Sequence, residues 1–223
     1  MGTLYLVRHG QASFGAADYD QLSDLGQRQC VRLGEWFKRH GIAFDAVLTG
    51  TLKRHAQSLA AIEAGLGVRH DELPLPGLDE YDGDALVRSV HPGPIAPATT
   101  PEQVRAHFML LREGLAAWMA GRTQPQGLKT HAQFVAGVVA ALDHVRTHHA
   151  DGRVLVVSSG GPSSHAVGHV LGLAPDPVID LNMHLRNSAV CEFRVSARRH
   201  TLITFNSLSH LDGPEHEGWV THA

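Results

Sequence analysis

Three polar segments of the chain carry residue types that could bind and transfer a phosphate group. Each follows a short apolar run: residues 8–10 (RHG), residues 49–54 (TGTLKR) and residues 158–161 (SSGG). The guanidinium groups of arginine match the oxygens of a phosphate, and the backbone N–H groups at a helix N-terminus favour an anion. An imidazole held among them could attack phosphorus and form a covalent intermediate. The three segments therefore predict a phosphate-handling site.

The elements that precede these segments predict how the segments meet. Apolar runs of strand length occupy residues 3–7, 43–48 and 154–157. Apolar residues recur at three- and four-residue steps over residues 22–37, and residues 51–65 show a second helical pattern. Alternating strands and helices favour a parallel sheet, and ligands of such sheets bind beyond the carboxyl ends of the strands. We expect an α/β three-layer sandwich, with a mostly parallel central sheet flanked by helices.

The middle and the end of the chain add an insertion and closing strands. Prolines are dense over residues 73–101, which predicts mostly loop, and residues 101–120 show a helical pattern. We expect residues 84–129 to form a loop and helical cap over the site. Residues 190–195 and 201–205 alternate apolar and polar side chains, and they predict a closing hairpin.

Length and composition limit the classes of protein to consider. The 223 residues fit one domain over residues 1–223, with the cap as an insertion. Lys and Arg number 19 against 22 Asp and Glu, a net charge of −3 that argues against a basic nucleic-acid binder. Cys30 and Cys191 are the only cysteines, too few for a disulfide framework or a four-cysteine zinc site. No signal-peptide pattern and no apolar run of about 18 residues is visible, so we expect a cytoplasmic protein without a membrane partner.

Five sequence blocks resemble those of the histidine phosphatase superfamily, the phosphoglycerate-mutase-like proteins, and they come in the family's order. The blocks are residues 4–10 (LYLVRHG), 22–29 (LSDLGQRQ), 51–58 (TLKRHAQS), 78–83 (LDEYDG) and 156–162 (VVSSGGP). The resemblance extends over nearly the whole chain and implies the α/β sandwich already expected from the pattern of elements.

The resemblance also implies roles for individual residues. His9 is the nucleophile that becomes phosphohistidine, and Arg8 and Arg54 clamp the phosphoryl oxygens. Glu80 protonates the leaving oxygen and then activates water, which requires a raised pKa for its carboxyl group. Neighbouring arginines disfavour imidazolium, so His9 can stay neutral near pH 7.

One position departs from the family pattern. Ser159 stands where the family usually has a second histidine, which helps to hold the phosphoryl group and adds positive charge. A serine hydroxyl donates one hydrogen bond but carries no charge. Ser159 could contact the ligand or only cap the helix that follows, while Gly160 offers a backbone N–H to phosphate in either case. Replacing Ser159 by histidine is expected to raise turnover, provided that the surroundings leave room for an imidazole.

These observations predict a phosphohydrolase that acts on phosphate monoesters through a phosphohistidine. Two alternatives remain open: a phosphoglycerate-type mutase, and a phospho-ligand binding or regulatory protein of low activity. The substrate is expected to be a small phosphate ester or a phosphoprotein, and a homodimer is possible. Histidines four residues apart, at 144 and 148 and at 165 and 169, lack the glutamate of a metalloprotease helix, so we expect no metal and no other cofactor.

Overall fold

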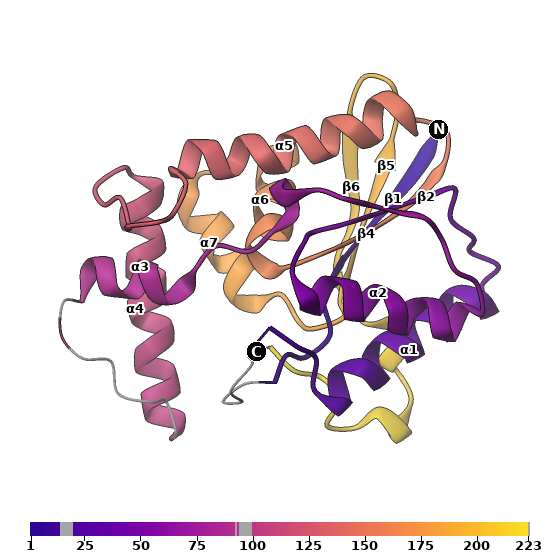
Figure 1. The fold of residues 1–223 in the computed structure, drawn as a ribbon, viewed down its shortest axis with the longest axis horizontal. Coiled ribbons are helices and arrows are strands. Elements are labelled where there is room, and N and C mark those ends of the chain that lie inside the picture. Colours follow the sequence, from indigo (N-terminus) through magenta and orange to yellow (C-terminus); the bar gives the residue numbers. More distant parts are fainter. Residues whose placement is uncertain (14–19, 92, 94–99, 223) are drawn as a thin grey trace.

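The computed structural model describes residues 1–13, 20–91, 93 and 100–222. Within them, one mixed sheet is flanked by helices (Figure 1). Its strands are β1 (Gly2–Arg8), β2 (Ala46–Thr49), β3 (Glu72–Pro74), β4 (Arg153–Ser158), β5 (Val190–Val195) and β6 (His200–Ser207). The helices are α1 (Asp24–Arg39), α2 (Lys53–Leu66), α3 (Gly83–Val90), α4 (Pro101–Met119), α5 (His131–His148), α6 (Gly160–Leu171) and α7 (Pro175–His184).

The strands lie in the order β3-β2-β4-β1-β5-β6. β4 is parallel to both of its neighbours, β1 and β2, and β2 is parallel to β3. β5 runs antiparallel to β1 and pairs with β6 as a hairpin. The mostly parallel α/β sheet and the closing hairpin predicted from the sequence are therefore confirmed.

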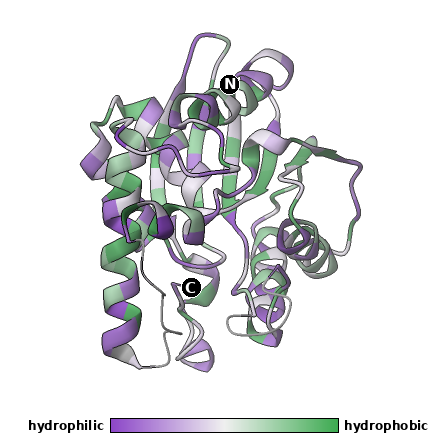
Figure 2. Cartoon of the chain, turned by 60° about the vertical axis from the view of Figure 1, so that its left-hand side comes forward, coloured by the Kyte–Doolittle hydropathy of each residue, from purple (hydrophilic) through white to green (hydrophobic). Residues whose placement is uncertain are grey.

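Two apolar cores cover the two faces of the sheet, as alternation along the strands requires. On β4, Val154 and Val156 belong to the core shared with α5 and α6, whereas Leu155 and Val157 belong to the core shared with α1 and α2. Figure 2 shows green, hydrophobic segments along the sheet and on the helix faces that meet it. This arrangement is a three-layer sandwich. In the part of the chain that the structure describes, no helix is long and apolar enough to cross a membrane.

The proline-rich region differs from the expectation of mostly loop. Residues 83–90 form α3, whose first turn is capped by the Asp82 side chain, an acceptor for the N–H of Ala85 at 2.9 Å. Leu86 and Val87 are buried, and α3 packs against α4, so tertiary burial supports a helix too short to be stable alone. The predicted helix over 101–120 is confirmed by α4, and α7 is a helix that sequence periodicity does not reveal. Residues 92 and 94–99 of the expected cap lie outside the described residues.

Helices α1 and α2 approach each other closely through glycines. A Cβ atom on Gly34 of α1 would lie 1.9 Å from the carbonyl oxygen of Ile62, and one on Gly65 of α2 would lie 2.1 Å from that of Val31. Both neighbours are backbone atoms, which cannot rotate away as a side chain can. The position of α2 on the sheet, and of every residue at its N-terminus, therefore depends on these two glycines.

We expect Gly34→Ala to lower the free energy of unfolding by about 2 kcal/mol, because the added methyl group overpacks the contact between α1 and α2. Urea denaturation measures the change. Gly83→Ala is the matched control, since its added Cβ would meet only the Leu111 side chain, at an ordinary 3.6 Å. Equal stability of the two variants would contradict this account of the helix contact.

Candidate functional site

The parallel register places three polar strand ends side by side. Arg8 at the end of β1 is opposite Ser158 at the end of β4, and Thr49 at the end of β2 is opposite Val157. One residue past the end of β1, the N–H of His9 still donates to the carbonyl oxygen of Ser158 at 2.8 Å. The three segments singled out in the sequence therefore meet at one edge of the sheet.

His9 lies at the centre of this edge, with only 4% of its surface exposed. Arg54 donates from Nε to Nε2 of the imidazole at 3.2 Å, and Nδ1 lies 2.7 Å from the carbonyl oxygen of Gly10. Because guanidinium nitrogens only donate, Nε2 must accept, so the proton of the neutral ring sits on Nδ1 and is donated to Gly10. Burial, with the charges of Arg8 and Arg54, holds the pKa of His9 well below its usual value. The ring is therefore neutral, with its lone pair directed at the Arg54 guanidinium.

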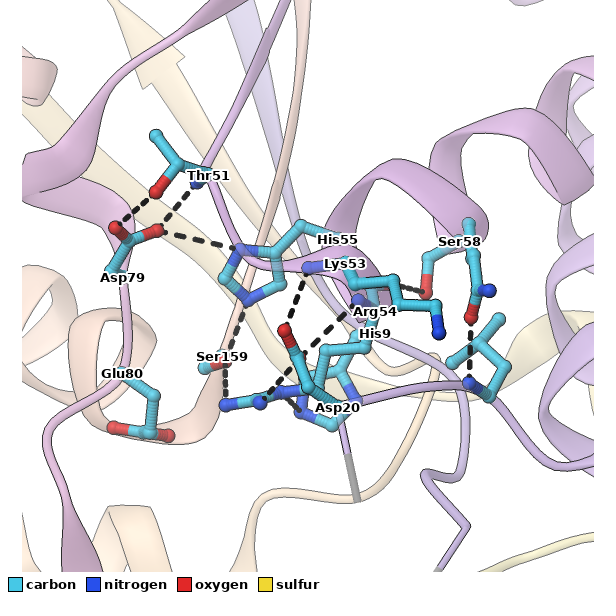
Figure 3. Close-up of polar contacts among 12 residues, drawn as sticks. His9, Asp20, Thr51, Lys53, Arg54, His55, Ser58, Asp79, Glu80 and Ser159 are labelled. Carbon is cyan, nitrogen blue, oxygen red and sulfur yellow. Dashed lines mark hydrogen bonds and ion pairs between the residues drawn. The ribbon is translucent and has the colours of Figure 1, made fainter. Parts of the chain in front are cut away.

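Arg54, in the first turn of α2, is itself anchored. Its Nη1 forms an ion pair with Asp20 at 2.8 Å, and the same carboxylate accepts the N–H of Lys53 at 2.9 Å (Figure 3). Its Nη2 lies 3.5 Å from the Ser159 hydroxyl oxygen. A guanidinium that reaches both His9 and Ser159 lies between β1 and β4, where an oxyanion bound at the strand ends would meet it.

Arg8 and Glu80 meet at the N-terminus of α6. Nη1 of Arg8 donates to the carbonyl oxygens of Leu185 and His222, the latter at 2.8 Å. A Cβ atom on Gly160 would lie 3.7 Å from Nε of Arg8 and 3.8 Å from Oε2 of Glu80. Both side chains therefore lie close to the backbone that opens α6.

Glu80 is distinguished from the other acids of its loop by its partners. Its Oε2 accepts the N–H of Gly161 at 3.0 Å, and its Oε1 accepts the N–H of Tyr81 at 3.3 Å. Burial raises the pKa of Glu80, although these hydrogen bonds and the two site arginines oppose the shift. The carboxyl group can therefore carry a proton at a higher pH than an ordinary glutamate.

The neighbouring acids have structural partners instead. Both oxygens of Asp79 contact Thr51, accepting its backbone N–H and, at 2.6 Å, its hydroxyl. Asp82 caps α3. Of these three acids in the loop, Glu80 alone contacts the N-terminus of α6.

Ser159 stands at the N-cap position of α6, but among the described residues its side chain makes no capping hydrogen bond. Its hydroxyl oxygen instead lies 2.7 Å from Nε2 of His55 and 3.5 Å from Nη2 of Arg54. The hydroxyl thus points into the site, and the reading of Ser159 as only a helix cap is wrong. Its side chain is buried and its hydroxyl oxygen already contacts Nε2 of His55, so an imidazole that followed the direction of this hydroxyl would meet the ring of His55. Ser159→His is therefore expected to need space that His55 now fills.

Sequence patterns do not single out His55, although it follows Arg54 directly. Its ring is fully buried, with its centroid 5.9 Å from that of His9. The signal that could have found it is its place in the first turn of a helix that begins at a strand end, where side chains face the ligand site. Within the described residues, no group of three or more His, Cys, Asp or Glu side chains could hold a metal ion.

Comparisons with known proteins agree with the fold and with the motifs. The model of the histidine phosphatase superfamily (branch 1) matches residues 4–208. YhfR of Bacillus stearothermophilus is similar in structure, with a TM-score of 0.69 at 17% identity over 94% of this chain and 99% of that chain. A mutant phosphoserine phosphatase from Entamoeba histolytica in complex with phosphoserine has a TM-score of 0.64 at 17% identity, covering 95% and 100%. A phosphoglycerate mutase from Bacillus anthracis has a TM-score of 0.63 at 18% identity, covering 93% and 94%.

We expect Arg54→Ala to weaken inorganic phosphate binding by about 3–5 kcal/mol, because a charge-assisted contact in a buried site is lost. Isothermal titration calorimetry with inorganic phosphate measures the loss. Arg146→Ala is the control, since Arg146 contacts Asp143 and the carbonyl of Ala197 far from the site. Unchanged phosphate affinity in the Arg54 variant would remove this residue from the site.

Proposed function

Since the chain belongs to the histidine phosphatase superfamily, branch 1, we propose that it hydrolyses phosphate monoesters through a phosphohistidine formed on His9. The observation that carries the proposal is the neutral imidazole of His9, whose Nε2 lone pair faces the buried guanidinium of Arg54. A phosphoryl group held by that guanidinium lies in front of the nucleophile. Arg8 and the raised-pKa carboxyl of Glu80 complete the set of groups that the reaction needs.

In the first step, an oxygen of the bound phosphoryl group replaces Nε2 of His9 as acceptor of the Arg54 Nε–H, and the freed lone pair of Nε2 attacks phosphorus. The N–P bond forms as the bond from phosphorus to the ester oxygen breaks, and Glu80 gives its proton to the leaving alcohol. Nδ1 keeps its proton, and the Gly10 carbonyl stabilises the positive charge that develops on the ring. Arg8 and Arg54 offset the negative charge of the phosphoryl oxygens.

In the second step, water attacks the phosphohistidine. Glu80, now a carboxylate, takes a proton from the water as the O–P bond forms and the N–P bond breaks. Inorganic phosphate leaves, the imidazole returns to its neutral form and Glu80 is protonated again. Transfer of the phosphoryl group to a second hydroxyl group, instead of water, would make the protein a mutase. The phosphoryl acceptor in this step therefore decides between phosphatase and mutase activity.

We also propose that the insertion over residues 84–129 sets which ester is hydrolysed. The strand-end groups recognise only the phosphoryl group, which sugar phosphates, nucleotides and phosphoproteins share. Helix α4 packs against α3 and α7, and α3 begins three residues after Glu80 in the chain (Figure 1). Loops and helices above a fixed scaffold are where substrate contacts concentrate.

We expect His9→Ala to lose all turnover of p-nitrophenyl phosphate, because the nucleophile is gone. In the wild-type protein, quenching during turnover of a 32P-labelled substrate is expected to leave label on His9 that is labile in acid and stable in base. His165→Ala, which removes another buried imidazole, is the matched control and keeps activity if it folds. Undiminished turnover by the His9 variant would end this mechanism.

We expect Glu80→Gln to slow the hydrolysis of alkyl phosphates by about 10²–10⁴-fold, and that of 2,4-dinitrophenyl phosphate much less. The reason is that a good leaving group departs without a proton. The ratio of kcat/KM for the two substrates measures this effect. Asp84→Asn is the control, because Asp84 is an exposed acid in the first turn of α3. An equal loss on both substrates would show that Glu80 is not the proton donor.

A further inference from the structure

Ser159, His55 and Asp79 lie far apart in the sequence but form a row of three side chains in the structure, with Ser159 at the end nearest Arg54. Nε2 of His55 lies 2.7 Å from the Ser159 hydroxyl oxygen, and Nδ1 of the same ring lies 3.9 Å from Oδ1 of Asp79. Figure 3 shows the imidazole between the carboxylate and the hydroxyl. Because Ser159 also lies 3.5 Å from Nη2 of Arg54, the row of carboxylate, imidazole and hydroxyl opens onto the phosphate site.

We propose that His55 is a positioning residue of the phosphate site, which acts through the Ser159 hydroxyl and takes up a proton when a phosphate group binds. This inference rests on the proposed function, in that the oxyanion binds between Arg54 and Ser159. The chain then has a second imidazole in its site after all. The ring comes from α2 and reaches the phosphate through one hydroxyl group, rather than directly from position 159.

Before phosphate binds, His55 is neutral. Burial and the charge of Arg54 lower the pKa of His55 to about 3, although Asp20 opposes the shift. We assign the ring proton to Nδ1, because Nδ1 lies 3.9 Å from Oδ1 of Asp79 and a lone pair there would face the carboxylate; Nε2 then accepts the Ser159 proton, while the Ser159 oxygen accepts from Arg54. In this state the hydroxyl group has no proton left to donate to a phosphoryl oxygen.

Binding of a phosphate ester changes the direction of these hydrogen bonds. A monoanionic ester gives its proton to the Ser159 oxygen, while the Ser159 proton passes to Nε2 of His55. The products are a dianionic ester, a neutral hydroxyl and an imidazolium, with the same number of protons and the same net charge. A dianion that enters from solution reaches the same state when His55 takes one proton from the solvent.

The groups that face His55 favour this change once the anion is present. Arg54 disfavours a positive ring and the neighbouring His9 is itself neutral, whereas Asp20, Asp79 and the bound dianion favour the charge. The imidazolium has one N–H for each neighbour: Nε2–H for the Ser159 oxygen and Nδ1–H for Asp79. The hydroxyl proton of Ser159 is then free to be donated to a phosphoryl oxygen.

The space beside Nδ1 is kept open by a glycine. In the part of the chain that the structure describes, Nδ1 of His55 is buried and has no hydrogen-bond partner. A Cβ atom on Gly50 would lie 2.2 Å from Nδ1 and 2.7 Å from Oδ1 of Asp79. Any other residue at position 50 would displace the ring or the carboxylate, so this backbone position fits the approach of Asp79 to a protonated His55.

The test measures proton uptake when tungstate binds. Tungstate mimics dianionic phosphate and stays unprotonated near neutral pH. Isothermal titration calorimetry in buffers of different ionisation enthalpy counts the protons taken up with each anion. We expect the wild-type protein to take up more protons than His55→Gln or Ser159→Ala, and its affinity for tungstate to rise between about pH 8 and pH 6 more steeply than theirs. Glu80→Gln is the control, because it removes the uptake that Glu80 contributes and leaves the difference due to His55.

Turnover gives a second readout. His55→Gln and Ser159→Ala are each expected to lower kcat/KM for p-nitrophenyl phosphate by about 100-fold, the effect of losing one hydrogen-bond donor. The combined variant His55→Gln/Ser159→Ala is expected to show no further loss, because the two side chains act as a unit. The double variant His55→Ala/Ser159→His, which makes room for an imidazole at position 159, is expected to exceed Ser159→Ala in kcat/KM. Equal proton uptake by the wild type and His55→Gln would overturn the inference.

A measurement on the wild-type protein covers variants that do not fold. The 15N chemical shifts of the His55 imidazole, with and without tungstate, report its protonation directly. A ring that stays neutral in the complex would also overturn the inference. Tungstate binding does not depend on turnover, so the two proposals fail in different ways. Full activity of His9→Ala would contradict the proposed function, whereas a neutral His55 in the tungstate complex would contradict the role proposed for His55.

Discussion

The hydrogen bond from Nε of Arg54 to Nε2 of His9 spans 45 residues of sequence, and the rest of the site is arranged around it. It fixes the tautomer of His9, since a guanidinium can only donate. It also requires the N-terminus of α2 to lie against the end of β1, which depends on the register of β1, β4 and β2 and on the close contact of α1 with α2. A small shift of either element would separate the proposed nucleophile from the guanidinium proposed to present phosphate to it.

Burial and positive charge act in the same direction on the two imidazoles of the site. Each loses water and gains a neighbouring guanidinium, so the pKa values of His9 and His55 both fall and both rings are neutral in the empty site. For His9, neutrality provides the lone pair of a nucleophile. For His55, which faces a hydroxyl and a carboxylate, neutrality provides a capacity to accept a proton. The difference comes from the partners of each ring rather than from its own chemistry.

Glu80 illustrates the opposite balance. Its carboxyl group receives two backbone hydrogen bonds and lies near two arginines, all of which favour the charged form, yet desolvation outweighs them and its pKa rises. A carboxyl group balanced in this way can give up a proton and recover it within one catalytic cycle. Gly161 contributes to this balance, since a Cβ atom there would lie 2.1 Å from Oε1 of Glu80 and would displace the carboxylate.

The sequence by itself determined the parallel sheet, the three strand-end segments and the place of Arg8 and His9 next to each other at the end of a strand. Apolar periodicity and chain order, on which these features depend, are local properties. The sequence also predicted Arg54 and Ser159 as members of the site, through motifs that stand in a fixed order along the chain. Only the tertiary structure decided which side chain Ser159 contacts, since His55 belongs to α2 and lies 104 residues away in the sequence. The structure likewise separated Glu80 from Asp79 and Asp82, and it turned residues 83–90 into a helix, because hydrogen-bond partners and buried surface depend on elements that meet only in the folded chain.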